Sequence, residues 1–156
     1  FEHAETSFLC GRIQTPDGVD RKNYGINEPR PVHRFNSLKV GTPELAIRPA
    51  AIHSLNIKFN PNFGAGCDNF IGDEAIFVTA MLKAKLVGLH VPVILGVHPP
   101  EASGSNFDTR GLRARVALFH ELFGLAAPFY RLAFSLKHRA RVGHLGTLIR
   151  FAIGRI

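Results

Sequence analysis

Residues 59–77 constrain the fold and chemistry of this chain more than any other stretch. A turn-rich segment with two glycines, Gly64 and Gly66, leads into two adjacent acidic residues, Asp73 and Glu74, which open an apolar run of helical character. Acidic side chains in the first turn of a helix lie beside unsatisfied N–H groups at the positive end of the helix dipole. The pattern therefore predicts a helix that begins with an acidic pair directly after a glycine-containing loop.

The carboxylate pair, Asp73 and Glu74, has two interpretations. The simpler one is that both acids only stabilise the start of a helix. The other is that one of them is a general base beside a loop where a substrate approaches the backbone closely. Partial burial by Phe70 and Phe77 is expected to raise the pKa of Glu74 and to oppose the effect of the helix terminus. The two glycines likewise indicate either contact between backbone and ligand or an ordinary turn with positive φ.

Turn signals and the spacing of apolar residues divide the chain into short elements. The polar segment at 19–36 carries two prolines and is expected to be an exposed loop. Strands are expected at residues 8–15, 37–41, 44–48 and 89–97, and helices at 49–55, 73–86 with a stop at Gly88, 111–123 and 128–140. This order predicts a mixed α/β fold.

Three signals occur in a fixed order: Phe-Asn-Pro-Asn-Phe-Gly-Ala-Gly at 59–66, then the carboxylate pair, then a strand ending Val-Pro-Val-Ile-Leu-Gly-Val-His-Pro-Pro at 91–100. Over roughly residues 8–110 this succession resembles the C-terminal half of a family 2 glycosyltransferase. The resemblance implies part of a GT-A fold, which is a Rossmann-like α/β fold of enzymes that use nucleotide-sugar donors. It also implies transfer with inversion, with Glu74 as the catalytic base and Asp73 as a residue that orients the acceptor.

His98 ends the last expected strand of this region. Imidazole binds divalent metals and phosphate oxygens, and the resemblance implies that His98 contacts a Mg²⁺ or Mn²⁺ ion or the donor diphosphate. The alternative is a hydrogen-bonded surface histidine. The family's Asp-X-Asp metal motif does not occur in this chain. The main metal ligands are therefore expected in an upstream half, and the chain is interpreted as a fragment.

Arg110 and Arg113 follow a loop rich in serine and glycine. Guanidinium groups bind diphosphates well, so both residues, with Arg115 beside them, are candidates for binding a diphosphate or a lipid-linked pyrophosphate. The alternative is a solvated helix face.

The net charge of +7 lies entirely in residues 111–156, which hold eight Lys/Arg and one acid, Glu121. The sequence therefore predicts a division into an acceptor-side half domain at 1–110 and a basic amphipathic helical tail at 111–156. On a helical wheel, Leu112, Val116, Phe119 and Phe123 share one face. Because Glu121 and Arg131 interrupt the apolar windows, the tail is expected to lie in the interface of an anionic membrane and not to cross it. The alternative is that these helices pack on the catalytic domain.

The expected function is transfer of one sugar to a glycan or lipid-linked acceptor, in cell-surface polysaccharide synthesis at the inner face of the plasma membrane. The alternative is a non-catalytic basic module that binds a membrane or a partner. Nucleic acid is not expected as a partner, because no recognition helix or RNA-binding signature is present. Cys10 and Cys67 form no metal-binding spacing and are interpreted as free thiols in a reducing cytoplasm.

Overall fold

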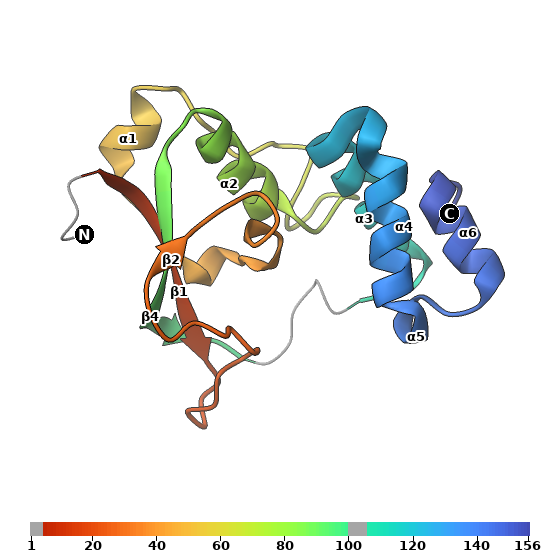
Figure 1. Cartoon of the computed structure of the whole chain (residues 1–156), viewed down its shortest axis with the longest axis horizontal. Helices are drawn as coiled ribbons and strands as arrows, with labels where there is room; N and C mark the ends of the chain where they lie inside the picture. Colours follow the sequence, from red (N-terminus) through yellow and green to blue (C-terminus); the bar gives the residue numbers. More distant parts are fainter. Residues whose placement is uncertain (1–4, 100–105) are drawn as a thin grey trace. The chain divides into compact units, whose positions relative to one another are not determined.

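The computed structural model describes residues 5–99 and 106–156 (Figure 1). By its internal packing the chain divides into two compact units, each described here by itself. Unit 1 comprises the described parts of residues 1–59 and 77–101, and unit 2 comprises residues 60–76 with the described part of 102–156. Residues 60–76 thus pack with the C-terminal helices, while the functional boundary expected after residue 110 stays a prediction.

Unit 1 is built on a four-stranded mixed sheet. Its strands are β1 (Thr6–Gln14), β2 (Arg30–Pro31), β3 (Leu45–Ile47) and β4 (Val87–Val97), in the spatial order β2-β4-β1-β3. The two long strands, β1 and β4, are parallel, and the short strands add to each edge in antiparallel orientation. The expected mixed α/β class, with a mixed sheet and C-terminal helices, is confirmed.

The core of unit 1 forms between this sheet and the second half of helix α2 (Asp73–Lys83). Phe77 stacks on Phe59 with ring centroids 4.1 Å apart. Burial raises the pKa of Cys10 to about 12, so its thiol stays neutral and acts as a small apolar side chain. The buried members are Phe8, Cys10, Val32, Val40, Phe77, Val78 and Met81.

The prediction of a strand at 37–41 is wrong. Two 3₁₀ turns, η1 (Ser37–Lys39) and η2 (Thr42–Glu44), occupy this segment. The hydroxyl of Ser37 donates to the carbonyl of Arg34, and the carboxylate of Glu44 accepts from the N–H of Gly41. These local side-chain hydrogen bonds favour turns over a strand ladder. The short helix expected at 49–55 is present as α1 (Pro49–His53).

The helix expected over 73–86 ends earlier than predicted, and its stop is not at Gly88. Helix α2 ends at Lys83, and Lys85 takes the left-handed conformation with φ 61°. Gly88 lies inside β4, where a Cβ atom would overlap the ring of Phe8. The glycine is therefore needed for close approach of two strands and not for a helix cap.

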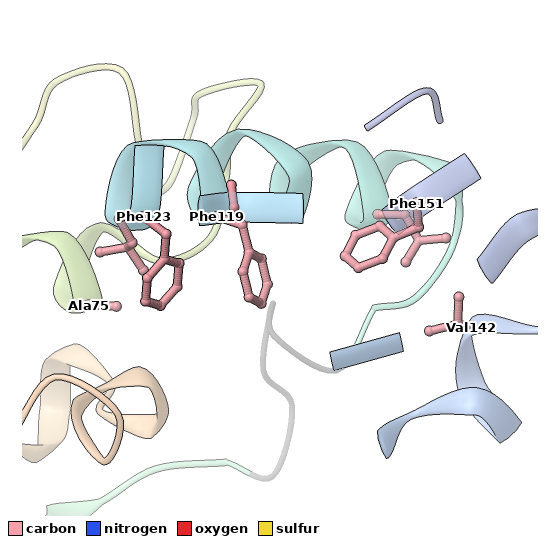
Figure 2. Packing of buried hydrophobic residues seen from close by; sticks show 8 residues of the cluster. Ala75, Phe119, Phe123, Val142 and Phe151 are labelled. Atoms are coloured by element: carbon pink, nitrogen blue, oxygen red, sulfur yellow. The ribbon is translucent and has the colours of Figure 1, made fainter. Parts of the chain in front are cut away.

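Unit 2 contains helices α3 (Thr109–Phe123), α4 (Ala127–Lys137), α5 (Arg139–Val142) and α6 (Leu145–Ile153). A 3₁₀ turn, η4 (Gly124–Ala126), joins α3 to α4. Asp108 caps α3 by accepting from the N–H of Gly111 at 2.7 Å. The hydrophobic cluster of this unit is drawn in Figure 2 and consists of Ala75, Leu112, Phe119, Leu122, Phe123, Ala127, Val142 and Phe151.

The predicted apolar face of the first C-terminal helix is confirmed, because Leu112, Phe119 and Phe123 are buried and Val116 packs against them. The second helix, expected at 128–140, is interrupted at His138, where the backbone leaves helical geometry (φ −107°, ψ 23°). The sequence analysis did not predict α6. In the part of the chain that the structure describes, no helix is long and apolar enough to cross a membrane.

Candidate carboxylate site

The glycine loop, residues 60–72, precedes α2 and is closed by its own backbone hydrogen bonds. The N–H of Gly64 donates to the carbonyl of Asn69 at 2.9 Å, and the N–H of Cys67 donates to the carbonyl of Gly64 at 3.1 Å. Gly64 and Gly66 have φ of 107° and 88°. Both conformations strain residues with a side chain, so each glycine has a backbone reason to be present.

Asp73 lies directly against Gly64. A Cβ atom at position 64 would be 2.9 Å from Oδ2 of Asp73, closer than side chains pack. A Cβ atom at Gly66 would meet no other atom within 4 Å. The absence of a side chain at Gly64 therefore allows the carboxyl group of Asp73 to lie against the loop backbone, while Gly66 serves only the turn.

The pKa of Asp73 is raised above its usual range. Burial is the largest cause, followed by the negative charge of Glu74 and by a side-chain hydrogen bond to Glu74. Backbone N–H groups at the start of α2 act in the opposite direction. The raised pKa expected for Glu74 stays a prediction.

Two of the expected arginines have defined places in unit 2. The guanidinium carbon of Arg110 lies 4.8 Å from the ring centroid of Phe70, a residue of the glycine loop. Arg113 is exposed and donates from Nε to the carbonyl of Ile156 at 3.1 Å. Their expected role in substrate binding stays a prediction, and Arg110 is the one that contacts the glycine loop.

Arg115, the third arginine of this group, is buried and serves the packing. Its guanidinium donates to the carbonyl of Gly111 at 3.0 Å and lies over the ring of Phe107 at 4.2 Å. Burial and the nearby charge of Arg141 lower the pKa of Arg115 to about 10.

His98 belongs to unit 1, whereas the carboxylate pair, the two glycines, Arg110 and Arg113 belong to unit 2. The N–H of His98 donates to the carbonyl of Gln14 at 2.9 Å, and its Nδ1 is 2.7 Å from the carbonyl of Pro99. Among residues 5–99 and 106–156 there is no group of three or more His, Cys, Asp or Glu side chains that could hold a metal ion. The metal role of His98 stays a prediction.

A buried polar cluster that the sequence analysis missed lines a cavity of about 270 Å³ in unit 1. The carboxylate of Glu44 is almost fully buried and binds Nζ of Lys22 at 2.7 Å and the hydroxyl of Tyr24 at 2.8 Å. Burial and this hydrogen bond raise the pKa of Tyr24 to about 12. The Gly-X-X-Glu spacing at 41–44 is the one sequence signal for this cluster, because it places Glu44 within reach of the Gly41 N–H.

His90 of β4 lines the same cavity. It is buried, and its Nε2 has no hydrogen-bond partner among the described residues. Burial lowers the pKa of His90 to about 4, and the positive charges of Arg30 and Lys22 act in the same direction. His90 is therefore a neutral imidazole at pH 7, and no sequence signal distinguishes it from a surface histidine.

Comparisons of this chain with protein-family models, with curated proteins and with solved structures find no match. The mixed α/β class rests on the structure alone, and the resemblance to family 2 glycosyltransferases stays a prediction.

Proposed function

We propose that this chain forms the acceptor side of an inverting glycosyltransferase, with Glu74 as the general base and Asp73 as its partner. The observation that carries this proposal is the fit between Gly64 and Asp73, in which a Cβ atom would lie 2.9 Å from the carboxyl oxygen. This contact places the carboxyl group of Asp73 against the backbone of the glycine loop, directly beside Glu74.

In the proposed reaction, a hydroxyl oxygen of the acceptor attacks the anomeric carbon of a nucleotide-sugar. The bond from that carbon to the diphosphate oxygen breaks on the opposite face, and the nucleoside diphosphate leaves with the electron pair. Glu74 takes the proton of the attacking hydroxyl. Asp73, whose pKa is raised mainly by burial and also by the charge of Glu74, lies beside the base and orients the acceptor.

Among the described residues there is no group of three or more His, Cys, Asp or Glu side chains that could hold a metal ion. A Mg²⁺ or Mn²⁺ ion on the leaving diphosphate, held in part by His98, stays a prediction from the resemblance. Arg110 is the described cation that lies against the glycine loop, through Phe70. We assign it to the diphosphate or to a phosphate of the acceptor.

The test measures release of nucleoside diphosphate from a panel of nucleotide-sugars by this protein. Glu74→Gln is expected to keep donor binding and to lower turnover by at least about 10²-fold, the scale of a positioned general base. Asp73→Asn is expected to lower turnover less. The matched control is Glu121→Gln, which makes the same change at an exposed acid of α3. Turnover of Glu74→Gln equal to that of Glu121→Gln would rule out the proposed base.

A further inference from the structure

Helix α4 and the turn before it carry a row of exposed apolar side chains. Leu125 and Phe129 are 98% and 76% exposed, and Leu132 and Leu136 are also exposed. The spacing of three and four residues places Phe129, Leu132 and Leu136 on one side of α4, and Leu125 lies in the turn that precedes the helix. Ala127 and Ser135, at other positions around the same helix, are fully buried. The exposed row is therefore separate from the surface through which α4 packs on unit 2.

Helix α6 repeats this arrangement. Leu145, Ile149 and Ile153, spaced by four residues, are 70%, 53% and 55% exposed, while Phe151 and Ala152 of the same helix are buried. The two helices lie side by side (Figure 1), and Nε of Arg131 on α4 donates to the carbonyl of Ala152 on α6 at 3.0 Å. We call the seven exposed residues of η4, α4 and α6 the apolar rows; they are Leu125, Phe129, Leu132, Leu136, Leu145, Ile149 and Ile153.

The segment that carries the apolar rows is uniformly basic. Residues 122–156 contain six Lys/Arg and no Asp or Glu. Lys137, Arg139 and Arg150 are exposed within or directly beside the two helices. Exposed apolar residues flanked by basic residues match a surface with an apolar interior and negative headgroups. An acidic protein partner would match the basic charges of this segment. It would not match the seven exposed aliphatic and aromatic side chains, which lie in a segment without acidic residues.

We propose that α4 and α6 dock into the interface of an anionic membrane, with the apolar rows among the acyl chains and Lys137, Arg139 and Arg150 at the headgroups. The membrane expectation from the sequence included the apolar face of α3. The apolar face of α3 is not part of the membrane surface proposed here, because Leu112, Phe119 and Phe123 are buried within unit 2. The proposal concerns binding alone and does not depend on the proposed sugar transfer.

The experiment is sedimentation of the full chain with vesicles of phosphatidylcholine alone or with phosphatidylglycerol added, at low and high salt. Binding is expected with the anionic vesicles, and it should weaken markedly at high salt. The double variant Phe129→Glu/Ile149→Glu is expected to reduce the partition coefficient at least about tenfold, because it removes two inserting side chains and adds two negative charges. The matched control is Val19→Glu/Leu55→Glu, which makes the same charge change at exposed apolar residues of unit 1.

If circular dichroism shows that the first variant does not fold, a second variant, Lys137→Gln/Arg139→Gln, tests the proposal instead. It changes exposed positions only and should weaken binding to anionic vesicles while reducing its salt dependence. Three outcomes overturn the proposal: no binding of the unaltered chain to anionic vesicles, equal binding to neutral ones, or equal binding of the folded Phe129→Glu/Ile149→Glu variant and its control. A dimer in sedimentation velocity that only Phe129→Glu/Ile149→Glu dissociates would instead assign the apolar rows to a second copy of the chain.

Discussion

The carboxyl group of Asp73 occupies the space that a side chain at Gly64 would need, since a Cβ atom there would lie 2.9 Å from Oδ2. Gly64→Ala should therefore move the carboxyl group, whereas Gly66→Ala meets no atom within 4 Å. Both variants adopt positive φ and should each lose about 1 kcal/mol of stability or more. Only Gly64→Ala should also lower turnover, by about tenfold or more if the carboxylate pair is catalytic.

Urea unfolding and nucleoside diphosphate release measure the two effects of these variants separately. Gly66→Ala is the control, because it introduces the backbone strain but no contact with another residue. Equal turnover of the two variants would show that the position of Asp73 does not matter for the reaction.

The pKa of Asp73 should be above the ordinary aspartate value of 3.8 and should fall in Glu74→Gln. Two of the causes that raise it, the charge of Glu74 and their hydrogen bond, weaken or disappear in that variant, while burial remains. Titration of the carboxyl carbon followed by NMR gives both midpoints. An unchanged midpoint in Glu74→Gln would show that burial alone sets the pKa.

The raised pKa of Asp73 also determines how this residue changes stability with pH. Because the folded state holds its proton more tightly than the unfolded state, this group favours folding below pH 3.8, and that contribution is lost as the pH rises through the folded pKa.

His90 should make unit 1 sensitive to mild acid. Its pKa is about 4 in the folded state against 6.5 in the unfolded chain, so the unfolded state binds more protons between these values. Stability is then fully present above pH 6.5 and is lost as the pH falls towards 4, by about 2 kcal/mol between pH 7 and pH 5. Urea unfolding at the two pH values measures it. His90→Gln should lose most of this difference, with the exposed His53→Gln as control.

Two ion pairs among the described residues of unit 1 should contribute very differently to stability. Lys22 is the counter-ion of the buried Glu44, whose side chain is 4% exposed, while Arg12 and Asp20 are 28% and 27% exposed. Lys22→Met leaves the buried carboxylate without this counter-ion, with hydrogen bonds from Tyr24 and Gly41 remaining, and should cost about 2 kcal/mol or more. Arg12→Met should cost less than about 1 kcal/mol. Equal losses in chemical denaturation would contradict the role assigned to Glu44.

The sequence predicted the elements whose patterns are local. The acidic start of α2, the Val-rich β4 and the apolar face of α3 all follow from spacing within one element, and all are present. The failures depend on contacts between distant residues. Gly88 resembles a helix stop until the ring of Phe8, 80 positions earlier, is seen beside it. Helix α6 was missed because Gly146 interrupts the pattern of its first turn, which packing against α4 nevertheless makes helical.

In the candidate site, too, local features could be predicted from the sequence, whereas features that depend on packing could not. The glycines and acids of residues 64–74 are close in sequence, so their proximity could be predicted from the chain alone. The charge state of Asp73 could not, because it depends on burial and on the neighbouring carboxyl group. The cluster around Glu44 escaped prediction for a related reason, since Lys22 and Tyr24 reach it from about twenty residues away.

The pairing of β1 with β4 sets an order of events during synthesis on the ribosome. Residues 6–14 are made before their parallel neighbour at 87–97, which follows some 80 residues later, and residues 60–76 between them belong to the other unit. Until β4 has emerged, β1 has only the three-residue β3 beside it, and Phe8 lacks the strand that covers it. The nascent chain therefore exposes an apolar strand edge until β4 has been made, which makes this period one in which it is prone to aggregate or to require a chaperone.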